Sequence, residues 1–379
     1  MKAKISQILS SFLVIVMLAA SCVNLLVWEF FFAFKQYLII LFIICNAVII
    51  LLNYQKTIRQ QLGIFVLGVI TLLIYCLNSM FYDSFSIREG GSALLLVNLI
   101  LALISFNAIS FSIKQTKFIL KMVGLFSIVY LLFHFLRSTP YNTNTLGTFS
   151  FVLLVYVLLW LEPYIQRLAV KLIIFSIFFA FAFFQECRSV LIGEFLFLIM
   201  LIFPFWVNKI FFRSLVIGLN LGSIILPPLW VKVWLSGFTL KIPFISKGLY
   251  SGRERVWDAF LNAFYDNPLI GSGNGVLQIP LEHYKEFTPH NFLLAILTVY
   301  GILIFILVFI LLTKILFNKR DEMAEAKVST LPLAGLLGIL ATSYFEIIPI
   351  SYIHSIMIWL LLAIINSKIK AANIQRGIK

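Results

Sequence analysis

The sequence predicts an all-α polytopic integral membrane protein that forms a single membrane domain over 1–379. Two observations carry this prediction. Hydrophobic residues make up 62% of the chain and charged residues only 12%, a balance typical of helical membrane proteins. The apolar residues also gather in runs of about 20, the length that an α-helix needs to cross a bilayer. A soluble globular fold is therefore excluded.

About twelve apolar runs are long enough to be expected as transmembrane helices. In chain order they lie at 8–29, 34–53, 62–80, 92–112, 117–136, 147–163, 168–185, 188–206, 210–231, 290–314, 329–345 and 350–367. One long polar stretch, 232–289, separates the ninth run from the tenth. The shorter mixed-charge stretch 318–327 is expected to be a solvated loop.

The distribution of positive charge predicts the orientation of these helices. Most of the 29 Lys and Arg residues lie on one side of the membrane, and the short loops on the other side hold only Lys35, Arg88, Arg137 and Arg188. Because Lys and Arg are retained in cytoplasmic loops, we expect both termini in the cytoplasm and 232–289 outside. The net charge of +14 then reflects topology and contact with membrane lipids, and it does not indicate a nucleic-acid partner.

No cofactor or metal site is predicted. The four cysteines show no CxxC or metal-ligand spacing, and the expected outer face offers no tight cluster of carboxylates or histidines. Gly271, Gly273 and Gly275 alternate as in a nucleotide loop, but no strand precedes them and no G-K-[ST] follows. We interpret them as a tight turn that needs positive φ values, with close backbone approach to a ligand as an addition.

The outer stretch contains an amphipathic helix, expected at 251–265. Ser251 and Glu254 match a capping box, which marks a helix start. Apolar residues then recur along one face at Val256, Trp257, Phe260, Leu261, Phe264 and Tyr265. Arg253 falls in the first turn on the face of Trp257, where a helix N-terminus favours an anion. Arg255 is rotated about 200° away and is expected to meet lipid headgroups.

Two further helix starts are expected on the same side of the membrane. Thr288 and Pro289 are read as the N-cap and first position of the helix that follows. His290 then lies in the first turn, where the helix dipole keeps the imidazole neutral and able to accept a proton. Arg188 heads the other helix. Two guanidiniums at helix N-termini favour a diphosphate ligand, although a terminal Arg can also simply reach for headgroups.

These residues resemble the O-antigen ligase and polymerase family of bacterial envelope glycan assembly. The resemblance rests on Arg188 at a helix head, on S-G-R-x-x-x-W at 251–257, on N-P-L-I-G-x-G-x-G at 267–275 and on P-H-N at 289–291. It implies a GT-C-type membrane glycosyltransferase of the bacterial inner membrane, with its active site on the periplasmic face. The implied donor is an undecaprenyl-diphosphate-linked glycan, and no metal or cofactor is implied.

The resemblance also implies roles for individual residues. Arg188 and Arg253 would bind the diphosphate, and His290 would act as the base that activates the acceptor hydroxyl. The candidates for orienting or secondary roles are Glu186, Trp257, Asp258 and Asn291, with Asp266 and Glu282 as further candidates for the base or its partner.

The sequence is compatible with three functions. The favoured one is an O-antigen or surface polysaccharide polymerase, which transfers the glycan to the sugar end of another lipid-linked repeat, with a chain-length regulator protein as a further partner. The compact outer stretch and the S-G-R-x-x-x-W form favour it over a ligase that attaches the glycan to lipid A core. A flippase for lipid-linked glycans is the third function. It would place charges at mid-membrane depth and have two related halves.

Overall fold

The fold is α-helical, as the sequence predicts, with one short hairpin. The computed structural model describes residues 28–82, 92–136, 143–203, 207–238, 252–273, 277–279, 285–346 and 354–377, together with isolated positions between 5 and 16. In chain order the helices are α2 Trp28–Leu52, α3 Tyr54–Tyr82, α4 Ser92–Ala108, α5 Ile113–Leu136, α6 Thr143–Leu161, α7 Leu168–Phe184, α8 Arg188–Ile202, α9 Lys209–Leu235, α10 Arg253–Asp266, α11 Phe292–Ala326, α12 Leu331–Thr342 and α13 His354–Gln375. The first expected span, 8–29, lies largely outside the described residues.

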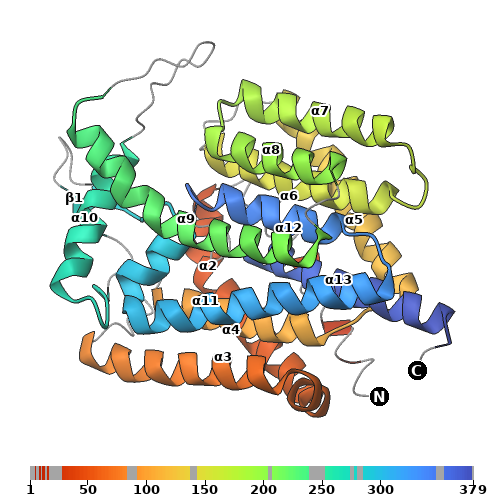
Figure 1. Cartoon of the computed structure of the whole chain (residues 1–379), viewed down its shortest axis with the longest axis horizontal. Coiled ribbons are helices and arrows are strands. Elements are labelled where there is room, and N and C mark those ends of the chain that lie inside the picture. Colours follow the sequence, from red (N-terminus) through yellow and green to blue (C-terminus); the bar gives the residue numbers. More distant parts are fainter. Residues whose placement is uncertain are drawn as a thin grey trace.

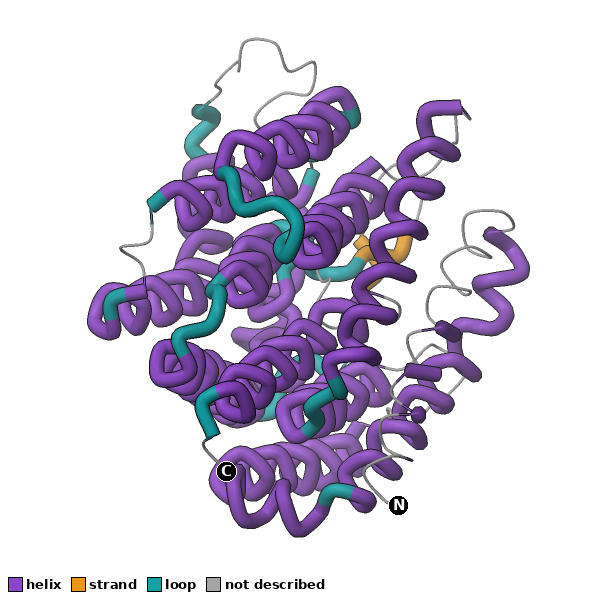
Figure 2. Tube along the Cα trace, turned by 90° about the vertical axis from the view of Figure 1, so that its right-hand side faces the viewer, coloured by secondary structure: helices purple, strands orange, loops and turns teal. Residues whose placement is uncertain are grey.

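The helices form a bundle with the shorter elements gathered at one end. Figure 1 shows α10 and the hairpin beside one end of α9 and α11, and Figure 2 shows the same bundle turned by 90°. The hairpin pairs β1 Leu277–Ile279 with β2 Lys285–Phe287 in antiparallel register, and the sequence had indicated no strand there. This end of the bundle carries the residues that the sequence analysis had singled out.

Several helices are suited to a membrane. Four are long and apolar enough to cross one: Ile113–Leu132, Lys209–Leu235, Phe292–Ala326 and Ser355–Gln375. Other apolar helices are shorter, and many large hydrophobic side chains of these apolar helices are exposed. A soluble protein rarely exposes so much continuous apolar surface. These helices fit a helical membrane protein.

Close helix packing joins α8 to α12. A Cβ atom built on Gly193 of α8 would lie 2.5 Å from the carbonyl oxygen of Gly338 and 2.0 Å from Oγ1 of Thr342, both on α12. Small residues allow such backbone contact between membrane helices. Because Thr342 ends α12, this contact holds the start of α8, with Arg188, near the turn that follows α12.

The glycine turn after α10 docks into a break in α11. Gly301 has φ 82° and ψ 172°, which interrupts the helix. The amides of Ser272 and Gly273 donate to Thr298 and Val299 of α11, and the amide of Ile302 donates to Pro268. These bonds satisfy backbone groups that the break in α11 would otherwise leave without partners.

The expected positive φ values of the turn are present, at 77° for Gly271 and 68° for Gly273. Gly275 lies outside the described residues. A Cβ atom on Gly271 would lie 2.5 Å from the backbone nitrogen of Gly301. The close approach that requires glycine here is therefore to α11 of the same chain.

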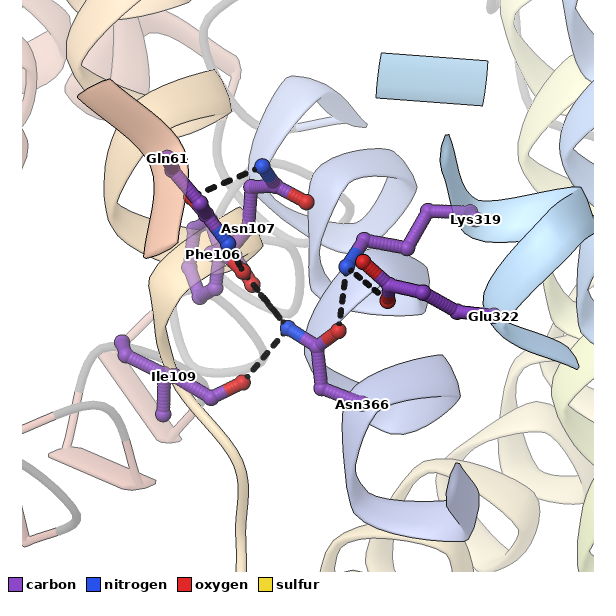
Figure 3. A network of polar contacts seen from close by, with 7 residues as sticks. All are labelled: Gln61, Phe106, Asn107, Ile109, Lys319, Glu322 and Asn366. Carbon is purple, nitrogen blue, oxygen red and sulfur yellow. Dashed lines mark hydrogen bonds and ion pairs between the residues drawn. The ribbon is translucent and has the colours of Figure 1, made fainter. Parts of the chain in front are cut away.

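A buried polar network fixes the end of the bundle away from α10 (Figure 3). The side-chain nitrogen Nδ2 of Asn366 donates to the backbone carbonyls of Asn107 and Ile109 at 2.7 and 2.8 Å, at the C-terminal end of α4. Its oxygen accepts from Nζ of Lys319 at 2.7 Å. Asn366 thus caps the free carbonyls of α4 and partners a buried ammonium. The side-chain nitrogen of Gln61 donates to the backbone carbonyl of Asn107, and the side-chain nitrogen of Asn107 donates to Oε1 of Gln61.

The stretch 318–327 is helical, so its interpretation as a solvated loop was wrong. Helix α11 continues through Ala326. Lys319 is only 2% exposed and also binds Glu322 at 2.7 Å. This pair at i, i+3 spacing supports the helix, and the contact with Asn366 draws the ammonium inward. Charge alternation alone did not reveal that one face of this stretch would pack against α13.

Replacing Asn366 with alanine is expected to destabilise the protein by about 2–4 kcal/mol, because buried carbonyls and a buried ammonium each lose a hydrogen-bond partner. Lys370→Ala, on an exposed position of the same helix, is the matched control. The measurement is the thermal unfolding midpoint of each variant purified in detergent. Equal midpoints for the two variants would contradict a stabilising role for the network.

Candidate active site

Four segments bring charged side chains together near α10. Arg188 begins α8, Arg253 begins α10, His290 precedes α11, and Glu346 follows α12. The charge of Arg188 interacts with those of Arg253 and Glu254. Three of the residues are those on which the sequence analysis had centred, and the fourth, Glu346, was not among its candidates. The structure therefore groups residues that lie up to 158 positions apart in the chain.

Arg253 is held by an ion pair and an aromatic ring. Its Nη2 donates to Oε1 of Glu346 at 2.6 Å, and the two side chains are 13% and 12% exposed. The guanidinium also lies 5.7 Å from the ring centroid of Phe345, within the range of a cation–π contact. Arg255 is exposed, in keeping with the opposite helix face. Arg253 thus has a fixed position at the border of the protein interior.

His290 lies outside the helix that was expected to contain it. Helix α11 starts at Phe292, and its N-cap is Asn291, whose side chain accepts from the amide of Leu294. The interpretation of Thr288 as N-cap and Pro289 as first helical residue was wrong, because an asparagine closer to the helix provides the stronger cap. His290 itself has φ 49°.

The carboxylate of Glu346 lies close to His290. Nδ1 of His290 lies 4.0 Å from Oε2 of Glu346, and the His290 side chain is 32% exposed. The separation is longer than a hydrogen bond, so a small movement is needed to close it. The two oxygens of one carboxylate thus face Arg253 and His290, and the imidazole keeps access to a ligand.

Asn291 joins three segments around the site. Its Nδ2 donates to the carbonyl of Ser223 at 2.8 Å and to that of Tyr344 at 2.9 Å. The Ser223 carbonyl needs this donor because Pro227, four residues later in α9, has no N–H. Asn291 therefore links the proline break of α9, the start of α11 and the turn that carries Glu346.

Trp257 plays a similar positioning role. It is completely buried, and its Nε1 donates to the carbonyl of Pro289 at 2.7 Å. Its ring lies 5.7 Å from that of Phe345, measured between centroids. The apolar stripe of α10 is buried at Val256, Trp257, Phe260 and Leu261. This packing fixes α10 against α9 and α11, and it sets the position of Arg253 one turn earlier.

Glu254 does not complete the capping box. Ser251 lies outside the described residues, and the N-cap of α10 is Gly252 with φ 84°. The Oε1 atom of Glu254 accepts instead from Nε1 of Trp230 on α9, at 3.0 Å. Glu254 pairs with Trp230 because an indole N–H inside the protein needs a hydrogen-bond acceptor. The helix consequently begins at Arg253, two residues later than expected.

The remaining candidate carboxylates lie in the turn before α8, on α10 and outside the described residues. Glu186 has φ 53° in the turn before α8, and its charge interacts with that of Arg188. Asp258 is half-buried on α10, Asp266 is exposed at its end, and Glu282 lies outside the described residues. Within the ranges that the structure describes, no group of three His, Cys, Asp or Glu side chains is placed to hold a metal ion.

Comparisons with models of protein families, with curated proteins and with solved structures found no match. Two guanidiniums bind phosphate oxygens well. An imidazole beside a carboxylate can accept and hold a proton. The group as a whole fits a reaction that releases a phosphate anion and deprotonates a hydroxyl.

We expect Asn291→Asp to destabilise the protein by about 2–4 kcal/mol, because the carbonyls of Ser223 and Tyr344 lose their donor and a charge is buried near them. Thermal unfolding in detergent measures this effect. Asn262→Asp, at an exposed position of α10, makes the same chemical change where little should be lost. A wild-type midpoint for Asn291→Asp would show that the three segments are held by other contacts.

Proposed function

We propose that the protein is a GT-C-type membrane glycosyltransferase that polymerises O-antigen or another surface polysaccharide. It would transfer a glycan from undecaprenyl diphosphate to the sugar end of another lipid-linked repeat, on the periplasmic face of the bacterial inner membrane. The observation that carries the proposal is the grouping of Arg188, Arg253, His290 and Glu346 from four segments of a helical protein of the membrane type. Both termini would be cytoplasmic.

The two arginines would bind the diphosphate. Their charges repel each other, and an anion between them relieves this repulsion. Both are partly withdrawn from water, which strengthens their attraction for a ligand. When the bond between the anomeric carbon and the phosphate oxygen breaks, its electron pair leaves with the diphosphate. Fixed cations stabilise the charge that develops there.

His290 would act as the base. The acceptor hydroxyl attacks the anomeric carbon, a new carbon–oxygen bond forms, and the hydroxyl proton passes to the imidazole. Direct displacement inverts the configuration at that carbon. Glu346 lies 4.0 Å from Nδ1 of His290 and would stabilise the imidazolium, as the carboxylate of a catalytic triad does.

Glu346 would also couple donor binding to base activation. In the structure its Oε1 pairs with Arg253 at 2.6 Å, while Oε2 faces His290. A diphosphate competes with Glu346 for the guanidinium. When it binds, the carboxylate is released from Arg253 and can close on the imidazole. The base then gains its partner only when the donor is in place.

Glu194 favours a second candidate, a flippase for lipid-linked glycans. This side chain of α8 is fully buried, and neither of its carboxylate oxygens has a hydrogen-bond partner. Ionisable residues inside membrane helices often belong to a transport path. The grouping of cations at one end of the bundle weighs against it, since a carrier needs such sites at mid-membrane depth.

Deletion of the gene, followed by gel analysis of the surface glycan, separates the candidates. A single repeat on the lipid core supports the polymerase. Complete loss of attached glycan, with long lipid-linked chains accumulating, would instead show the ligase that attaches glycan to lipid A core. Loss of outward exposure of the lipid-linked repeat would show the flippase.

Arg253→Ala and Arg188→Ala are each expected to lower glycan transfer roughly 10- to 150-fold, because a charge-assisted contact to phosphate is worth about 1.5–3 kcal/mol. Transfer is measured with purified protein and an undecaprenyl-diphosphate-linked donor. Arg255→Ala is the matched control, since Arg255 lies two residues away on the exposed face. An inactive Arg255→Ala beside an active Arg253→Ala would contradict the site.

His290→Ala is expected to lower the rate constant of transfer about 100-fold or more while leaving donor binding unchanged. Glu346→Gln should also lower this rate constant, but the donor should bind as tightly as before or more tightly, because a competitor for Arg253 has been removed. Binding and single-turnover transfer are measured separately, with membrane levels of each variant checked first. Weaker donor binding by Glu346→Gln would rule out the proposed competition.

A further inference from the structure

We propose that an anionic phospholipid binds at the end of α9 far from the candidate active site, with its headgroup on Lys209, Arg213 and Arg320. This end begins at Lys209, about 40 Å along the helix from its other end at the usual rise per residue. Nothing in the glycosyltransferase proposal uses these residues.

Three cations converge on one carboxylate at this place. Asp321 of α11 lies 3.8 Å from Nζ of Lys209, 3.7 Å from Nη2 of Arg213 and 2.8 Å from Nη1 of Arg320. One negative charge cannot neutralise three positive ones. The neighbouring acid, Glu322, is paired with the buried Lys319. The four-residue cluster therefore keeps an excess of two positive charges.

The cations remain accessible to a ligand but differ in freedom. The side chains of Lys209 and Arg213 are 54% and 46% exposed. Arg320 is only 16% exposed and is fixed by its bonds to the carbonyl of Val207. Arg213 also lies 5.2 Å from the ring centroid of Phe317. One fixed guanidinium and two more exposed cations can surround a phosphate group from different sides.

The surface that continues from the cluster is suited to an acyl chain. Large apolar side chains are exposed along one face of α9, at Ile210, Ile217, Leu221, Ile225 and Leu229. Their spacing of seven and then four residues follows a single helix stripe. A soluble anion would use only the cations. The adjoining apolar stripe favours a phospholipid, whose headgroup and chains would contact both, and basic pockets between membrane helices commonly bind such headgroups.

The test compares lipids that differ only in the headgroup. Full-length protein in detergent is mixed with phosphatidylglycerol or with phosphatidylcholine of the same acyl chains, and bound lipid is counted by native mass spectrometry. We expect phosphatidylglycerol to bind preferentially. The double variant Lys209→Gln, Arg213→Gln should bind phosphatidylglycerol roughly 10- to 30-fold more weakly. This is the loss expected when two basic residues no longer attract an anionic headgroup. Equal retention of the two lipids by the wild-type protein would overturn the proposal.

Two further variants make the result specific. Asp321→Asn removes the competing carboxylate, so it should bind phosphatidylglycerol more tightly; weaker binding by this variant would overturn the proposal even if the double variant fails to fold. Lys114→Gln, Lys117→Gln removes two exposed cations of α5 and should leave binding unchanged. An equal loss in this control would show general electrostatic attraction. Displacement of the lipid by inorganic phosphate at equal concentration would show a site for soluble anions.

Discussion

The two hydrogen bonds donated by Asn291 determine where the rest of the candidate site lies. Each bond satisfies a carbonyl where a helix is interrupted or has ended. One is the Ser223 carbonyl, which Pro227 leaves without a donor, and the other is the Tyr344 carbonyl in the turn after α12. A carbonyl inside the protein that lacks a hydrogen-bond donor is costly. These two bonds therefore fix the position of the Asn291 side chain. His290 precedes it, and Glu346 lies two residues beyond its second partner.

The ion pair between Arg253 and Glu346 fixes the position of a cation in the candidate site. Its side chains are 13% and 12% exposed, so each charge would be costly without the other. Such a pair contributes little net stability compared with apolar packing, but it fixes both groups in position. Phe345 and Trp257 exclude water on one side of it. The arrangement holds a cation ready for a ligand without leaving it unpaired in the absence of that ligand.

Sequence alone predicted the helices well, since a long apolar run in this composition has few alternatives. The apolar stripe of α10 also predicted the burial of Val256, Trp257, Phe260 and Leu261, but Tyr265 at its end is 65% exposed. Reasoning failed where distant segments compete for local groups. Glu254 binds Trp230 of α9 instead of capping its own helix, and Asn291, not Thr288, is the N-cap of α11. Lys319 was assigned to a loop because its partner Asn366 lies 47 positions away.

Glu346 could have been found from the sequence. The predicted topology places it in the connection between the last two apolar runs, on the same side as Arg253 and His290, and it is the only acidic residue after Glu325. The candidate carboxylates predicted from the sequence lie in the long polar stretch and in the turn before α8, and Glu346 lies in neither. A lone acid in a short loop indicates a partner only when the topology shows which cations share its side of the membrane.

The charges around the two arginines also set a condition on the ligand. Arg188 interacts with Glu186 and Glu254, and Arg253 is paired with Glu346. These two guanidiniums and three carboxylates together carry a net charge of −1 before anything binds. A ligand must displace a carboxylate that is already in place, and a single negative charge gains little from that exchange. A diphosphate brings more charge and more acceptor oxygens than the carboxylate it replaces. The surrounding glutamates would therefore select for a diphosphate and against the monoanionic headgroups that are abundant in any membrane.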